Sequence, residues 1–88
     1  MWLVYILQSE VDGDYYKGIT QNIEKRLSEH NAGESKFTSS KTPWKVVCTY
    51  SFENKREALI EEKRIKKLNR KSIELLIKKN DDLSRSRL

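Results

Sequence analysis

The sequence predicts an α+β domain in which a small three-stranded antiparallel sheet is flanked by helices, in the order ββαβαα. Residues 2–8 are nearly all apolar and rich in β-formers, as in a strand buried on both faces. Asp12-Gly13 is a strong two-residue hairpin signal, and residues 14–20 return as a second strand. Residues 44–52 alternate in polarity and predict a third strand. Its apolar positions, expected on one face, are Trp44, Val46, Cys48, Tyr50 and Phe52.

The first predicted helix covers residues 22–31. Thr20 or Asn22 can supply a side-chain oxygen for its N-terminal cap. Gly33 is a natural stop, because glycine readily adopts the left-handed backbone conformation that ends many helices. Residues 33–43 then form a polar, basic loop that leads into the third strand.

Two further helices are predicted after the third strand. Asn54, with a glutamate three residues later, resembles a capping box and begins a helix that runs to about Leu68. Apolar side chains at helical spacing predict a short last helix over residues 71–78. We therefore expect one domain over residues 1–78 and a frayed tail over residues 79–88.

Length and charge limit the classes of function. The chain has 88 residues, which suits one domain with a small core, and its formal net charge is +5. A basic balance in so small a domain predicts attraction to polyanions, with nucleic acid ahead of an anionic membrane.

The chain offers little for disulfide, zinc or membrane chemistry. Its one cysteine, Cys48, lies in an apolar strand and is interpreted as a small buried side chain. One cysteine and one histidine cannot assemble the usual zinc ligands. The apolar N-terminal run is too short to span a membrane and lacks the features of a signal peptide. We expect a cytoplasmic protein without a membrane partner.

A glycine inside the second strand is unexpected. With a two-residue turn, Tyr5 would lie opposite Thr20, and Tyr5, Tyr16 and Gly18 would share one face of the sheet. A glycine in a strand forfeits side-chain packing and often marks where a ligand or another backbone comes close. A β-bulge, or a helix packed on the bare position, is the alternative.

The first helix places two cationic groups beside its apolar stripe. Ile23 and Leu27 define that stripe, and Arg26 and His30 lie at its edge, one turn apart. Together they could face a phosphate. The alternative is an arginine that extends to solvent and a histidine that completes the core.

The second helix carries a carboxylate within its apolar face. Glu62 projects there and needs a partner, because an unpaired buried charge costs several kcal/mol. The partner could be an arginine or a divalent metal, and an ion pair with Arg26 is the simplest structural alternative. Glu61 lies on the other flank of the same stripe, so periodicity favours Glu62 only slightly.

Two basic clusters flank these positions. The chain turns heavily basic after Glu62, through the end of the second helix and into the next segment, with Lys63, Arg64, Lys66, Lys67, Arg70 and Lys71. The loop and third strand add Lys36, Lys41 and Lys45. Such runs are usually solvated faces, but their placement is also that of a track for a phosphate backbone.

The same segments resemble a known family. "LVYIL", "DGDYYKGIT", "NIEKRLSEHN" and "EALIEEKRIKKL", in this order, are similar to the GIY-YIG nuclease domain. The chain most resembles the small stand-alone bacterial proteins of that superfamily, which are related to the N-terminal domain of the DNA repair protein excinuclease C. The resemblance covers roughly residues 1–78 and implies the three-stranded antiparallel sheet with flanking helices.

The resemblance also implies site residues. Tyr5 matches the tyrosine of the first motif, and Tyr16 and Gly18 match the tyrosine and glycine of the second. Arg26 matches the helix arginine, and His30 a position often occupied by histidine. The implied roles are a general base for Tyr5, positioning of water or phosphate for Tyr16, charge neutralisation for Arg26 and assistance in proton transfer for His30.

Glu62 matches the family's metal-binding glutamate, which selects it over Glu61 and implies one Mg²⁺ or Mn²⁺ ion. Lys17 stands at the middle position of the second motif; we expect it to contact substrate with Gly18, Lys36 and Lys41. The loop has serines where close relatives often place another arginine, which affects DNA affinity or substrate preference.

The activity implied by the resemblance is metal-dependent hydrolysis of a phosphodiester by a structure-directed or weakly specific DNA endonuclease. A non-catalytic nucleic-acid-binding module of the same fold is the alternative. Because no second domain is present to choose a target, a protein partner could supply specificity. The sequence leaves the oligomeric state open.

Overall fold

The computed structural model of the protein describes residues 1–86 and the side chains of residues 1–81. Its sheet contains three antiparallel strands in the order β2-β1-β3, with three α-helices in the predicted ββαβαα sequence. The predicted fold class is confirmed. The elements are β1 (Trp2–Ser9), β2 (Tyr15–Thr20), α1 (Ile23–Asn31), the short helix η1 (Ser39–Lys41), β3 (Trp44–Phe52), α2 (Lys55–Lys66) and α3 (Arg70–Ser86).

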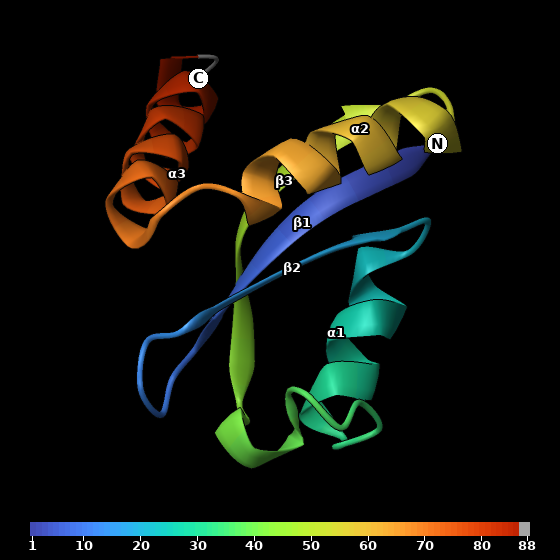
Figure 1. Cartoon of the computed structure of the whole chain (residues 1–88), viewed down its shortest axis with the longest axis vertical. Helices are drawn as coiled ribbons and strands as arrows, with labels where there is room; N and C mark the ends of the chain where they lie inside the picture. Colours follow the sequence, from blue (N-terminus) through green and yellow to red (C-terminus); the bar gives the residue numbers. More distant parts are fainter. Residues whose placement is uncertain (87–88) are drawn as a thin grey trace.

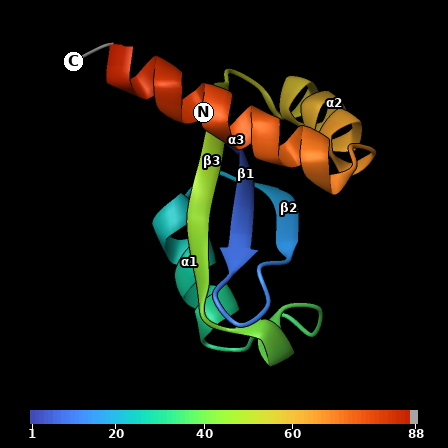
Figure 2. The same cartoon turned by 90° about the vertical axis from the view of Figure 1, so that its left-hand side faces the viewer.

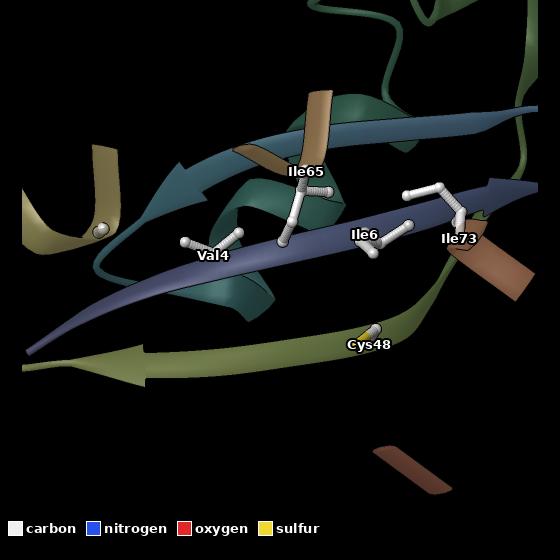
Figure 3. Close-up of a cluster of buried hydrophobic side chains, with 6 residues drawn as sticks. Val4, Ile6, Cys48, Ile65 and Ile73 are labelled. Atoms are coloured by element: carbon white, nitrogen blue, oxygen red, sulfur yellow. The ribbon is translucent and has the colours of Figure 1, made fainter. Parts of the chain in front are cut away.

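The central strand β1 is buried on both faces, as its apolar sequence predicts. Val4 and Ile6 face the side covered by α2 and α3, where they pack with Ile65 and with the first turn of α3 (Figure 3). Tyr5 and Leu7 face the side covered by α1. The sheet is therefore the middle of three layers, and α1 lies apart from α2 and α3 in Figure 1.

Alternation along one strand thus assigns side chains to two separate environments. The α2 and α3 side holds the larger apolar cluster, which includes the buried Cys48, as predicted from its apolar strand. In Figure 2, α3 lies across the top of the molecule, above the strands.

The register of the β1–β2 hairpin differs from the prediction by two residues. Tyr5 pairs with Gly18, not with Thr20, and Tyr16 pairs with the leucine two residues after Tyr5. Because side chains alternate with a period of two, a shift of two residues leaves every side chain on its predicted face. Tyr5, Tyr16 and Gly18 do share one face of the sheet.

The shift arises in the turn, which is longer than a two-residue connection. The backbone nitrogen of Ser9 donates to the Asp14 oxygen at 2.8 Å, and that of Gly13 donates to the Ser9 oxygen at 3.0 Å. Gly13 has φ +79°, a conformation that favours glycine. Asp12-Gly13 does mark the turn, but the loop also takes in the two residues before it.

A β-bulge divides β3 between the two faces. Ile6 pairs with Cys48 whereas its neighbour Leu7 pairs with Val46, which leaves one extra residue in β3. The predicted single apolar face is therefore wrong. Trp44 and Val46 lie on the face of Leu7, and the later apolar positions of β3 lie on the face of Ile6.

The helix caps follow the sequence closely. Asn22 caps α1 through a hydrogen bond from the Lys25 backbone, and Asn54 caps α2 through one from the Glu57 backbone. Gly33, with φ +78°, follows the end of α1 as predicted. No helix in the described part of the chain is both long and apolar enough to cross a membrane.

The last helix is longer than predicted. It begins at Arg70 and continues to Ser86, whereas the sequence predicts an end at residue 78 and a frayed tail over residues 79–88. Asn80 extends the packing of this helix by donating to the Thr49 backbone oxygen of β3 at 3.5 Å. The rest of the expected tail, residues 87–88, lies outside the described residues.

Replacing Asn54 with alanine tests the α2 cap. The side-chain oxygen of Asn54 accepts from the Glu57 nitrogen at 2.9 Å, so its loss leaves a donor of the first turn without this partner. We expect the free energy of unfolding, measured by urea denaturation, to fall by about 1 kcal/mol. Asn54→Asp keeps the acceptor and should stay near wild type; an equal loss in both variants would contradict the capping role.

Candidate functional site

Tyr5 lies at the centre of the candidate site. Its ring extends from β1 on the α1 side of the sheet, and the residue is only 1% exposed. The Nε group of Arg26 donates to the Tyr5 hydroxyl oxygen at 3.3 Å. The Nε2 atom of His30 lies 3.2 Å from the same oxygen. The structure thus joins β1 to two successive turns of α1 through one phenol.

Gly18 makes this position of Tyr5 possible. A Cβ atom built on Gly18 would lie 2.5 Å from the Tyr5 hydroxyl oxygen and 2.7 Å from its Cζ atom. The end of the phenol therefore occupies the space above the bare backbone of β2. The sequence suggested that a ligand or another backbone comes close to Gly18, but the tyrosine of the neighbouring strand fills that space.

His30 is fully buried behind Tyr5. Its Nδ1 atom lies 2.8 Å from the hydroxyl oxygen of Thr38, which is also fully buried. His30 therefore does not face a phosphate together with Arg26, as the helix pattern had suggested. Of the two groups that hydrogen-bond Tyr5, only Arg26 reaches solvent, with a side chain that is 35% exposed.

Thr38 holds the end of this network and was not predicted as a site residue. Besides contacting His30, its backbone oxygen accepts a hydrogen bond from Trp44 Nε1 at 2.9 Å. Periodicity gives no direction to side chains in an irregular loop. The only signal for Thr38 in the sequence is composition, because the loop after the His30 helix is rich in serine and threonine.

The donors and acceptors favour one arrangement of protons. Burial lowers the pKa of His30 below its usual value, and the nearby charge of Arg26 lowers it further, so the imidazole is neutral at neutral pH. If Nδ1 carries the proton, it donates to Thr38, and Nε2 accepts from the Tyr5 hydroxyl. Thr38 then donates to the Ser35 oxygen at 3.5 Å. Only this arrangement gives every hydroxyl hydrogen an acceptor within the network.

Burial also acts on Tyr5. It raises the pKa of the phenol above its ordinary value of about 10, the hydrogen bond and charge of Arg26 oppose that increase, and the negative charge of Glu62 adds to it. The net direction is upward. In the free protein Tyr5 is therefore a neutral phenol whose proton already has His30 as an acceptor.

Tyr16 lies at the more open side of the site. Its ring packs edge-on against His30, with 4.8 Å between ring centroids, and against Trp44 at 6.3 Å. Among the described residues, nothing hydrogen-bonds its hydroxyl group. Tyr16 is half-buried, so this phenol is free to hydrogen-bond a ligand.

Arg26 borders a hollow of about 420 Å³ at the start of α1. The walls come from the end of β2, the first turns of α1 and Trp2, and include Asn22, Lys25 and Glu29. Arg26 itself contacts Glu29, with 3.4 Å between Nη1 and Oε1. The hollow thus combines two cationic side chains and the N-terminus of a helix, which suit a phosphate group, with one carboxylate that already contacts Arg26.

Glu62 approaches the site from the opposite side of the sheet. It lies on α2, its side chain is 16% exposed, and it contacts Lys66 at 3.4 Å. The alternative ion pair with Arg26 does not form, since Arg26 contacts Glu29. The charge of Glu62 nevertheless raises the pKa of Tyr5, whereas that of Glu61 raises the pKa of Tyr50 on β3. The two glutamates therefore face different parts of the sheet.

A metal site here would depend on one carboxylate. The described residues contain no group of three or more His, Cys, Asp or Glu side chains placed to hold an ion. Mg²⁺ commonly binds through one or two carboxylates while substrate phosphates and water complete its shell. Glu62 fits such an ion when a nucleic-acid phosphate supplies further oxygens.

The predicted substrate-binding lysines lie in three different settings. Lys17 pairs with Ile6 and so lies on the α2 face, away from Tyr5. Lys41 forms ion pairs with Asp12 and Asp14, which a substrate phosphate would have to displace, and its substrate contact stays a prediction. Lys36 is exposed and forms no ion pair within the described residues.

Comparisons with known proteins agree with this architecture. The GIY-YIG catalytic domain family matches residues 1–79. A UPF0213 protein of Halobacterium salinarum is 43% identical over 74 residues, which cover 83% of this chain and 95% of that protein. One from Clostridium perfringens is 48% identical over 68 residues, covering 76% of this chain and 72% of that protein.

A solved structure is similar as well. The solution NMR structure of a UPF0213 protein from Bacillus halodurans matches with a TM-score of 0.57 and 35% sequence identity. The match covers 89% of this chain and 84% of that one. The similarity therefore extends over the sheet and most of the helices.

Substituting Gly18 with alanine should displace Tyr5. The added methyl group would overlap the phenol, so we expect a loss of about 1–3 kcal/mol in the free energy of unfolding and a change in the near-ultraviolet circular dichroism of the tyrosines. Lys17→Ala, on the same strand but the other face, is the matched control. A Gly18→Ala protein as stable as wild type, with unchanged tyrosine signals, would contradict the close approach.

The single histidine allows its pKa to be measured directly by NMR. We expect the His30 imidazole of the folded protein to titrate below 6.5 and that of the urea-unfolded chain near 6.5. The contribution of this pKa difference to the free energy of unfolding is fully present above pH 6.5. It declines as the pH falls from there through the folded-state pKa, because the unfolded chain binds the proton more tightly. A folded-state value at or above that of the unfolded chain would contradict the burial of a neutral imidazole.

Proposed function

Because the chain belongs to the GIY-YIG catalytic domain family, a family of nucleases, we propose that it is a metal-dependent endonuclease that hydrolyses DNA phosphodiester bonds. The observation that most supports this is the Tyr5 hydroxyl, which is held between the Arg26 guanidinium and the neutral His30 imidazole. Any buried phenol needs a hydrogen-bond partner, but the charged donor and the basic acceptor found here are also the partners that a proton relay requires. We expect the enzyme to be structure-directed or weakly specific.

In this proposal Tyr5 relays a proton from the attacking water. The Tyr5 oxygen accepts the proton of the water while the phenol proton passes to His30 Nε2, so Tyr5 never has to exist as a free phenolate. His30 becomes an imidazolium that still donates to Thr38 through Nδ1. The relay avoids the cost of ionising a buried phenol whose pKa is raised.

Substrate reaches Tyr5 past Arg26. Arg26 is the partly exposed partner of the phenol and borders the hollow at the start of α1, so a scissile phosphate placed there would meet its guanidinium. A fixed positive charge at that point stabilises the negative charge that develops on the phosphoryl oxygens. The free hydroxyl group of Tyr16 then orients the water or the phosphate.

Glu62 would hold the one divalent ion, Mg²⁺ or Mn²⁺. Bound there, such an ion polarises a phosphoryl oxygen and stabilises the departing oxygen. To serve in this way, Glu62 must exchange its contact with Lys66 for the ion, and that contact is a partly exposed pair within one helix. Such pairs contribute little to stability, so the exchange costs little.

One observation favours a second candidate, a nucleic-acid-binding module without activity. The pKa of Tyr5 is raised in the free protein, which is the opposite of the shift expected for a base that acts alone. If His30 does not accept the proton, the basic surface remains but catalysis does not. Cleavage and binding therefore have to be measured separately.

The test uses branched, nicked and linear DNA incubated with Mg²⁺ or Mn²⁺. We expect Tyr5→Phe and Glu62→Gln each to lower the cleavage rate about 100-fold or more while DNA binding is retained. Glu61→Gln is the matched control, because this neighbour contacts Arg64 and faces β3. Its cleavage rate should equal that of wild type.

The outcomes separate the candidates. Cleavage that survives both Tyr5→Phe and Glu62→Gln would come from another nuclease and would reject the proposed site. Binding without cleavage under every metal condition would reject the enzyme and support the binding module.

A further inference from the structure

We propose that Phe37 is a stacking site for an unpaired nucleobase, and that it directs the protein to DNA with exposed bases. This inference deepens the proposed function and rests on it. The observation behind it is an aromatic side chain that the structure leaves in solvent although the next residue, Thr38, is buried and hydrogen-bonded.

Phe37 is 85% exposed. Among the other aromatic side chains of the site, Tyr5 is 1% and Trp44 4% exposed, and Tyr16 is half-buried. A phenylalanine side chain in water forgoes the burial of a large apolar surface. The loop therefore presents a flat apolar ring that packs on nothing in the described protein.

The backbone on either side of Phe37 is fixed. Thr38 is fully buried, contacts His30 through its hydroxyl and accepts from Trp44 Nε1. The Thr38 nitrogen also donates to the Ser35 oxygen at 3.2 Å. Thr38 points into the core and Phe37 out of it, on the loop that follows the end of α1. The hollow bordered by Arg26 lies at the start of the same helix, so a strand bound at both places would run along α1.

The charge near Phe37 complements a nucleotide. Lys36 precedes it, is exposed, and forms no ion pair within the described residues. Lys45 is also exposed, but it pairs with Gln8 and so lies on the α2 face of the sheet, away from this loop. Lys41 forms ion pairs with Asp12 and Asp14. An aromatic ring beside an available lysine is the combination used for single-stranded nucleic acid, where the ring stacks on the base and the cation meets the phosphate.

Stacking on Phe37 implies a preference among DNA structures. In a duplex both faces of a base are covered by its neighbours, so a ring on a rigid loop cannot reach them unless the base is displaced. Single strands, flaps and branch points present open base faces. We therefore infer that Phe37 favours substrates with unpaired bases, whereas Lys36 acts on any phosphate backbone.

The test measures binding in a Glu62→Gln background, so that cleavage does not interfere. The probes are a single-stranded oligonucleotide containing 2-aminopurine and the same strand in a complete duplex. We expect Phe37→Ala to weaken single-strand binding about ten- to a hundred-fold and to leave duplex binding almost unchanged. Phe37→Trp keeps an aromatic ring, so it should bind the single strand about as tightly as the protein with the native phenylalanine, and it should quench the 2-aminopurine fluorescence.

Two controls identify the cause. Leu75→Ala removes another exposed apolar side chain, 61% exposed on α3, and should change neither affinity. Lys36→Ala should weaken the binding of both probes and reduce the salt dependence of binding. Equal weakening of both probes by Phe37→Ala, or no weakening, would overturn the stacking site. Cleavage by the wild-type protein tests the proposed function independently of either result.

Discussion

The close contact between the Tyr5 phenol and the bare backbone of Gly18 is the constraint on which the rest of the site depends. Any side chain at Gly18 would occupy the position of the Tyr5 hydroxyl group. Because the phenol extends over β2, its oxygen lies within hydrogen-bonding distance of Arg26 and His30 on α1. One strand pairing, Tyr5 with Gly18, thus determines where two turns of a helix must pack.

Packing and electrostatics are coupled through that contact. Burial keeps the Tyr5 phenol and the His30 imidazole neutral, and each neutral form needs a partner that completes its hydrogen bonds. Thr38 supplies the last partner, which ties the α1–β3 loop to the sheet. Arg26 is the charged member of the network, and its ability to reach solvent gives the buried pair its connection to a ligand.

The sequence allowed the fold, and the common sheet face of Tyr5, Tyr16 and Gly18, to be predicted, because local chemistry determines them. Asparagine caps, a glycine stop and two-residue periodicity each depend on a few neighbouring residues. The hairpin register, the β-bulge and the extent of α3 could not be predicted, since they depend on pairing and packing across the fold. The ion pairs of Lys41 and the contact of Thr38 with His30 have the same origin: both join segments that periodicity does not align.

The separation of Glu62 from the tyrosines by the sheet has a consequence for metal binding. Tyr5 and Arg26 lie on the α1 side and Glu62 on the α2 side, yet the charge of Glu62 acts on Tyr5. One carboxylate that already contacts Lys66 is a weak site for an ion by itself. A phosphate bound near Arg26 could complete the shell of that ion only around the β2 edge of the sheet, because magnesium–oxygen contacts are about 2 Å long. An ion at Glu62 should therefore bind more tightly when nucleic acid is present.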